Sequence, residues 1–147
     1  MSTDSMTLSE RAEIVAALNA AFSKRYHSLA QYIAEAKPYV PKGQEALQIT
    51  IRQIAAEDRA EAERIADVIE SLEEIPQVEP YDPDIAKMNY LSIVYLKKIL
   101  MTELEKELPW LEKMAEKAAY HPAARNALQS LARKRRSQIA RMRIVQS

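Results

Sequence analysis

The sequence predicts an all-α protein, an antiparallel four-helix bundle with a longer connection between its second and third helices. Its 147 residues include one glycine and few aromatic residues, whereas Ala, Glu, Leu, Ile, Lys and Arg dominate, which is the composition of long helices. In four segments, separated by prolines, apolar residues recur at alternating steps of three and four, as on one face of a helix. A chain of this length forms one domain by default, so residues 1–147 are expected to be a single bundle.

Composition excludes several functional classes. The chain has no cysteine, hence no disulfide, thiolate ligand or thiol nucleophile, which suits a reducing cytosol. Residues 1–7 are polar and lack the apolar core of a signal peptide, and no apolar run approaches the thickness of a bilayer. The formal net charge is zero, so no global field attracts nucleic acid. We therefore expect a cytoplasmic protein with no membrane partner.

The first helix is expected to begin at Thr7-Leu8-Ser9-Glu10, which has the spacing of a capping box. It is expected to continue to about Ala36, before Lys37-Pro38. Its predicted inward stripe is apolar apart from one charge, Arg25, and consists of Ile14, Leu18, Ala21, Arg25, Ser28 or Leu29, and Tyr32.

The second helix, about Gln44 to Ile75, carries two carboxylates where a core is expected. Its stripe consists of Ile51, Ile54, Asp58, Glu61, Ile65, Val68 and Leu72. Burying an unpaired charge is costly, so Asp58 and Glu61 require a metal ion, a proton or a cationic side chain.

Three prolines follow within residues 76–83, so this segment cannot be helical throughout. About ten extended residues reach roughly 33 Å, enough to run along the outside and join two parallel helices. Asp82 is the expected N-cap of the third helix, with Pro83 at its first position. This helix is expected to reach Ala119, with Pro109 inside it and a stripe of Ile93, Leu96, Leu100, Glu103, Glu107, Trp110 and Met114.

The fourth helix is expected from Pro122 to about Val145. Its stripe consists of Ala124, Leu128, Leu131, Arg135, Gln138 and Met142, with a one-residue uncertainty in register that would bring Arg136 inward instead of Arg135. The segment has no acidic residue and many arginines, which complements the acidic second helix. The polar residues midway along the four stripes should meet at the centre of the bundle.

Several of these segments resemble the ferritin-like superfamily, specifically bacterioferritin and rubrerythrin-type proteins. Leu18-Asn19, Arg25 and Gln31-Tyr32 resemble the first helix of bacterioferritins, Asp58-x-x-Glu61 with Ile65, Leu72 and Ile75-Pro76 resembles the second, and Met101-Thr102-Glu103-Leu104 resembles the ligand-bearing turn of the third. The resemblance spans nearly the whole chain. It implies a bundle with a di-iron centre and self-association, with a dimer as the expected form; the sequence does not distinguish a dimer from a cage.

Most of the ligands that the resemblance implies are replaced. Arg25 stands where the family has a glutamate, Asp58 and Glu61 where it has Glu-x-x-His, and Arg135 and Gln138 at the corresponding pair of the fourth helix; only Glu103 keeps the ligand type. His27 lies off the Arg25 stripe, and His121 precedes a proline in a loop, so neither supplies a missing histidine. Arginine stays charged and does not ligate metals. We therefore expect the di-metal centre to be lost and no cofactor to bind.

The predicted replacement is a buried ion-pair network, which would comprise Arg25, Asp58, Glu61, Glu103, Arg135 and Gln138. In this interpretation the protein has a structural or interaction role and is not an enzyme.

Two alternatives remain open. One is an atypical iron or manganese site with oxygen chemistry, formed by Asp58, Glu61, Glu103 and Glu107. The other is a polyanion-binding protein that uses residues 133–136. Nucleic acid is disfavoured as a partner because no aromatic or glycine residue accompanies this basic run and the acidic second helix offers internal partners.

Overall fold

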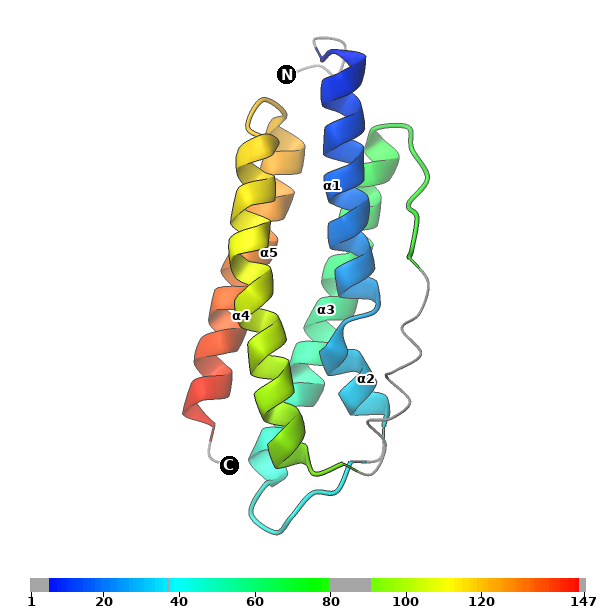
Figure 1. The fold of residues 1–147 in the computed structure, drawn as a ribbon. Helices are drawn as coiled ribbons and strands as arrows, with labels where there is room; N and C mark the ends of the chain where they lie inside the picture. Colours follow the sequence, from blue (N-terminus) through cyan, green and yellow to red (C-terminus); the bar gives the residue numbers. More distant parts are fainter. Residues whose placement is uncertain (1–5, 37, 80–90, 146–147) are drawn as a thin grey trace.

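The computed structural model describes residues 6–36, 38–79 and 91–145. Within these ranges the chain forms four long helices and one short one (Figure 1). They are α1 (Leu8–Tyr26), α2 (Leu29–Glu35), α3 (Glu45–Ser71), α4 (Ile93–Lys117) and α5 (Pro122–Ile144). The described ranges contain no strand, and the single β-bridge pairs Tyr39 with Ser92. The predicted all-α class is confirmed.

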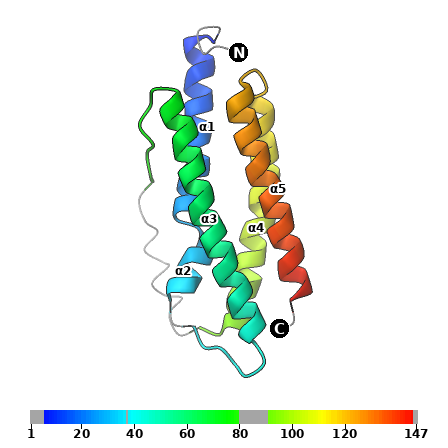
Figure 2. The ribbon, with the colours of Figure 1, turned by 180° about the vertical axis from the view of Figure 1, so that it is seen from behind.

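The long helices lie side by side along one axis. In Figures 1 and 2, α1 and α3 run in opposite directions, as do α4 and α5, whereas α3 and α4 run in the same direction. The chain therefore leaves α3 at one end of the molecule and enters α4 at the other. No helix in the described part of the chain is long and apolar enough to cross a membrane.

The chain from Thr7 to Ala36, expected as one helix, divides at His27 and Ser28. Ser28 has extended backbone angles and its side chain accepts a hydrogen bond from the backbone N–H of Gln31, so it caps α2. The Gln31 side-chain amide donates to the carbonyl oxygens of Arg25 and Tyr26 at the end of α1. Ser28-Leu29-Ala30-Gln31 has the Ser-x-x-Gln spacing of a helix start, which is the local signal for this break.

The other boundaries lie close to the predicted ones, except at the start of α4. The capping box at Thr7 and Glu10 is present, and α5 begins at Pro122 with the His121 side chain as its cap. The helix α4 begins at Ile93 and is capped by Ser92. The predicted cap Asp82 and the residues that follow it, up to residue 90, lie outside the described residues.

The core consists of two apolar clusters, one toward each end of the long helices. The first cluster includes Leu18, Ile65, Leu111 and Leu128, and the second includes Ile33, Ile54, Leu96 and Ile139. At the level between the two clusters each long helix contributes polar side chains: residue 25 in α1, 58 and 61 in α3, 107 in α4, and 135 and 138 in α5. The bundle is therefore divided by one polar layer near its middle.

Candidate functional site

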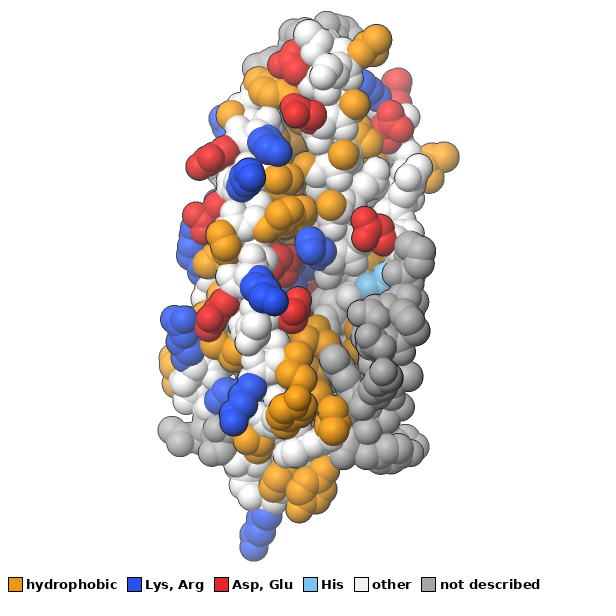
Figure 3. Space-filling model, viewed as in Figure 1, with side chains coloured by type: hydrophobic (Ala, Val, Ile, Leu, Met, Phe, Trp, Pro, Cys, Tyr) orange, Lys and Arg blue, Asp and Glu red, His pale blue; other side chains and the backbone are white. Residues whose placement is uncertain are grey.

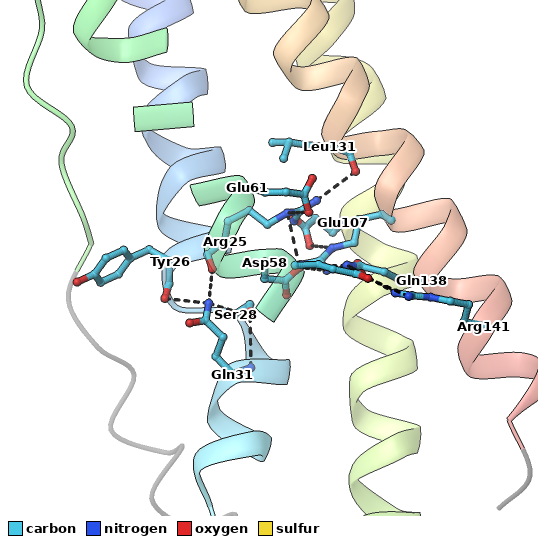
Figure 4. Close-up of polar contacts among 12 residues, drawn as sticks. Arg25, Tyr26, Ser28, Gln31, Asp58, Glu61, Glu107, Leu131, Gln138 and Arg141 are labelled. Atoms are coloured by element: carbon cyan, nitrogen blue, oxygen red, sulfur yellow. Dashed lines mark hydrogen bonds and ion pairs between the residues drawn. The ribbon is translucent and has the colours of Figure 1, made fainter. Parts of the chain in front are cut away.

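We call the polar residues at this level the ionic layer: Arg25, Asp58, Glu61, Glu107, Arg135 and Gln138. Figure 4 shows the labelled members of this layer, Arg25, Asp58, Glu61, Glu107 and Gln138, meeting between the helices. Arg25, Asp58 and Gln138 are fully buried, and Glu61 and Arg135 are 3% and 2% exposed; the Glu107 side chain is 11% exposed. Charges this deeply buried are tolerated only when they are paired.

Arg135 joins α5 to α3 and α4. Its Nε donates to Glu107 Oε2 at 2.8 Å, and its Nη1 donates to Asp58 Oδ1 at 2.8 Å. Nη1 also donates to the Gln138 side-chain oxygen. Burial by itself lowers the pKa of Arg135, but the charges and hydrogen bonds of Glu107 and Asp58 outweigh burial and raise this pKa.

Arg25 brings α1 into the same network. It donates to Glu107 Oε1 and to the backbone oxygen of Leu131 at 3.2 Å. Its Nε lies 3.5 Å from Glu61 Oε1 and 4.0 Å from Asp58 Oδ1. Burial and the nearby Arg135 lower the pKa of Arg25, although a guanidinium group remains a cation at neutral pH.

Glu107 bridges the two arginines. Arg25 donates to one of its carboxylate oxygens and Arg135 to the other. Burial raises its pKa, but the two guanidinium groups have the larger combined effect, so the pKa of Glu107 falls below its ordinary value. Glu107 is therefore the ionised centre of the network.

Glu61 is held less tightly. Its Oε1 accepts no hydrogen bond from the described residues. Burial, followed in the same direction by the charge of Asp58, raises the pKa of Glu61 to about 7 despite the opposing effect of Arg25 and Arg135. The ionic layer contains three carboxylates and two guanidinium groups. When Glu61 carries a proton, the net charge of the layer is therefore zero.

A second ion pair extends the layer toward the surface. The Gln138 side-chain nitrogen donates to Asp58 Oδ1 at 3.3 Å and to Glu57 Oε1 at 3.0 Å. Arg141 donates to both carboxylate oxygens of Glu57. Burial raises the pKa of Glu57, but the hydrogen bonds from Arg141 and Gln138 have the larger combined effect, so the pKa of Glu57 falls below its ordinary value. Glu57 and Arg141 were not predicted from the sequence, where the only signal for them is the general complementarity of an acidic and a basic helix.

The structure brings together five of the six residues predicted for the network and leaves out Glu103, which is exposed. The predicted stripe of α4 is wrong by one residue at Glu103, Trp110 and Met114, and it is correct at Glu107. Leu104 is buried four residues after Leu100, and Leu111 and Ala115 follow. An apolar side chain thus takes the inward position, and Glu107, one turn further on, enters the layer.

The register of α5 follows the first of the two predicted options. Arg135 is buried, whereas Arg136 faces solvent and pairs with Glu112 at 3.1 Å. His27 lies beside Tyr32, with its Nδ1 2.9 Å from the tyrosine hydroxyl, and His121 is the buried cap of α5. Neither histidine belongs to the ionic layer.

The side chains of the layer do not fit a di-metal centre. Both oxygens of Glu107 and one of Asp58 accept hydrogen bonds from guanidinium groups. Across residues 6–36, 38–79 and 91–145, no group of three or more His, Cys, Asp or Glu side chains is arranged to hold a metal ion. The cations that contact these carboxylates are side chains of the protein itself.

Because the pKa of Glu61 is raised in the folded protein, we predict that this residue makes the protein less stable as the pH rises. The unfolded chain releases this proton near pH 4.5, whereas the folded chain keeps it up to about pH 7, so the contribution of Glu61 to stability is lost across this interval. The free energy of unfolding of the wild type, minus that of Glu61→Gln, should fall by about 2 to 3 kcal/mol from pH 5 to pH 8.

Urea unfolding at intermediate pH values measures this difference. Glu63→Gln is the matched control, because Glu63 is an exposed residue of the same helix, and its curve should run parallel to that of the wild type. If the free energy of unfolding of Glu61→Gln also ran parallel to that of the wild type, Glu61 would not have a raised pKa in the folded protein.

Comparison of the chain with protein-family models, with characterised proteins and with solved structures gives no match.

Proposed function

We propose that this protein is a ferritin-like bundle, of the bacterioferritin and rubrerythrin kind, in which the ionic layer stands in place of a di-iron centre. In this proposal it has a structural or interaction role and is not an oxidoreductase. The observation that carries the proposal is the position of Arg25 and Arg135. Both are buried at the middle of the bundle, and both contact carboxylates of α3 and α4.

The arrangement of the helices also supports the proposal. A long connection that lets α3 and α4 run in the same direction is the crossover plan of ferritin-like bundles. Each long helix then contributes to the layer at the level where ligands of such a centre would lie. Positive charge at that level comes from guanidinium groups, which neither ligate metals nor exchange protons at neutral pH.

A buried layer of this kind has a physical use without a cofactor. Each charged member has a partner on another helix, so sliding one helix along its neighbours would leave buried charges unpaired. We infer that the layer sets the register of the four long helices, much as a buried polar residue sets the register of a coiled coil.

The interaction role concerns the surface. Leu8, Ile75 and Ile144 are 88%, 80% and 75% exposed, but Leu8 begins α1 and Ile144 ends α5 at the opposite end of the bundle, so they do not form one apolar patch. By resemblance to ferritin-like proteins we propose that the partner is a second copy, as a dimer. Light scattering coupled to gel filtration measures the mass directly, and a monomer at micromolar concentration would contradict this part of the proposal.

Metal analysis tests the proposal as a whole. Protein purified from cells grown with added iron and manganese should contain far less than one metal ion per chain. The matched variant restores the implied ligand types with Arg25→Glu, Glu61→His, Arg135→Glu and Gln138→His, and it should gain metal. Near-stoichiometric metal in the wild type would overturn the proposal and favour an atypical carboxylate site.

The polyanion-binding alternative is weakened by the register of α5. Residues 133–136 do not share a face: Arg135 points inward, whereas Arg133 and Arg136 are exposed and Arg136 pairs with Glu112. We therefore expect no salt-sensitive retention of nucleic acid in a filter-binding assay at low and high salt.

A further inference from the structure

The chain between α1 and α2 breaks two residues after Arg25, the residue that brings α1 into the ionic layer. In the view that Figures 1 and 3 share, this junction lies about midway along the molecule, where the surface carries acidic and basic side chains between apolar ones. The apolar period of the sequence continues through residues 27–28, so burial of apolar side chains does not by itself favour a break here. Local hydrogen bonds therefore decide where the helix ends.

The Gln31 side chain caps the end of α1. The last four carbonyl groups of a helix have no partner within the helix, and Gln31 Nε2 donates to two of them, the backbone oxygen of Arg25 at 2.5 Å and that of Tyr26 at 3.2 Å. Figure 4 shows the Gln31 amide turned toward these two carbonyl groups. Gln31 is 7% exposed. Removing its amide would therefore leave carbonyl oxygens without a donor in a place that water hardly reaches, which is costly.

The other end of the same amide is held by α3. Gln31 Oε1 accepts hydrogen bonds from Nε and Nη2 of Arg59, both at 3.2 Å. Arg59 Nη2 also lies 3.6 Å from Glu35 Oε1 at the end of α2. One buried side chain therefore links the end of α1, the first turn of α2 and the middle of α3.

Arg25 is held from two sides. Its backbone oxygen accepts a hydrogen bond from Gln31, whereas its guanidinium group contacts the carboxylates of the ionic layer. Helix ends fray when their last carbonyl groups lack partners. Because Arg25 is the second residue from the end of α1, fraying of the last turn would withdraw it from the layer.

We propose that Gln31 is a positioning residue that, together with Arg59, fixes the junction of α1 with α2 and thereby holds Arg25 in the ionic layer. This inference rests on the register role proposed for the layer, but the two fail separately. The stability of Arg25→Ala tests the layer, whereas substitutions at Gln31 test the junction.

Amide hydrogen exchange locates the effect. In Gln31→Ala the backbone amides of residues 24–33 should exchange at least about tenfold faster than in the wild type, because buried carbonyl groups lose their donor. Amides in the middle of α5 should change less. Gln53→Ala, at an exposed position of α3, is the control and should leave residues 24–33 unchanged.

Gln31→Glu separates the two ends of the amide. It keeps an acceptor for Arg59 but replaces the donor by a carboxylate oxygen, so residues 24–33 should exchange faster in this variant too. Unchanged exchange of these residues in Gln31→Ala, or equal acceleration in every helix, would overturn the proposal.

A double-mutant cycle tests whether Gln31 acts through Arg25. The second background is Arg25→Met with Glu61→Leu, in which position 25 has no ion pair to maintain. Gln31→Ala should raise the equilibrium constant of unfolding at least about fivefold more in the wild type than in this background, as measured by urea unfolding. An equal effect in both backgrounds would mean that Gln31 only caps a helix, and the positioning role would be wrong.

Discussion

Replacing Arg25 by alanine should lower the free energy of unfolding by about 3 to 5 kcal/mol, the cost of removing one partner from a buried ion pair. Arg25 is fully buried and contacts Asp58, Glu61 and Glu107. Without it, three buried carboxylates face one guanidinium group, and the Leu131 carbonyl oxygen loses a donor. Chemical denaturation followed by circular dichroism measures the loss, which should appear as a sharply lower Tm as well.

The matched variant removes a charge of each sign. Arg25→Met with Glu61→Leu keeps the volume roughly constant and leaves Asp58 and Glu107 paired with Arg135. Replacing a buried ion pair by apolar side chains of similar size is often close to neutral, so the double variant should be clearly more stable than Arg25→Ala. Similar small losses in both would mean that the buried charges are not coupled.

Replacing Arg135 by alanine should have an effect of the same size, about 3 to 5 kcal/mol, because Asp58, Glu107 and Gln138 all lose a donor. The neighbouring residue provides a control within the same helix. Arg136 is exposed and forms one surface ion pair with Glu112, so Arg136→Ala should cost at most about 1 kcal/mol. The same denaturation experiment on both variants compares the two faces of α5, and equal losses would contradict the buried position of Arg135.

The positions of the charged residues were predictable where the surrounding pattern was long and unambiguous. Asp58 and Glu61 follow two isoleucines and precede Ile65 in an unbroken helical period, and the two lie in the layer as the stripe required. Arg25 and Arg135 were found in the same way, since each interrupts an otherwise apolar stripe.

The pattern was ambiguous in α4, where both a step of three and a step of four from Leu100 are compatible with a helical face. The step of three selected Glu103, and the structure uses the step of four to Leu104. Burial of the apolar side chain decides this choice, because a leucine gains free energy on leaving water whereas an unpaired glutamate loses it. Weighing the two residues against each other would have removed Glu103 from the predicted network and left Glu107, which was already on the predicted stripe, as the acidic residue of α4 in the layer.

The break after α1 was missed for a different reason. The apolar period continues through residues 27–28, so periodicity alone gives one helix. The capping signal of Ser28 with Gln31 is local, and it changes the direction of the chain without changing which face is apolar.

The most direct test of the central claim is the electron density between Asp58, Glu61 and Glu107 in crystals grown with Fe²⁺ or Mn²⁺, measured with anomalous diffraction at the metal edge. We predict density for the guanidinium groups of Arg25 and Arg135 between these carboxylates and no anomalous peak at that position. An anomalous peak near full occupancy, with the two guanidinium groups displaced from the carboxylates, would contradict the account.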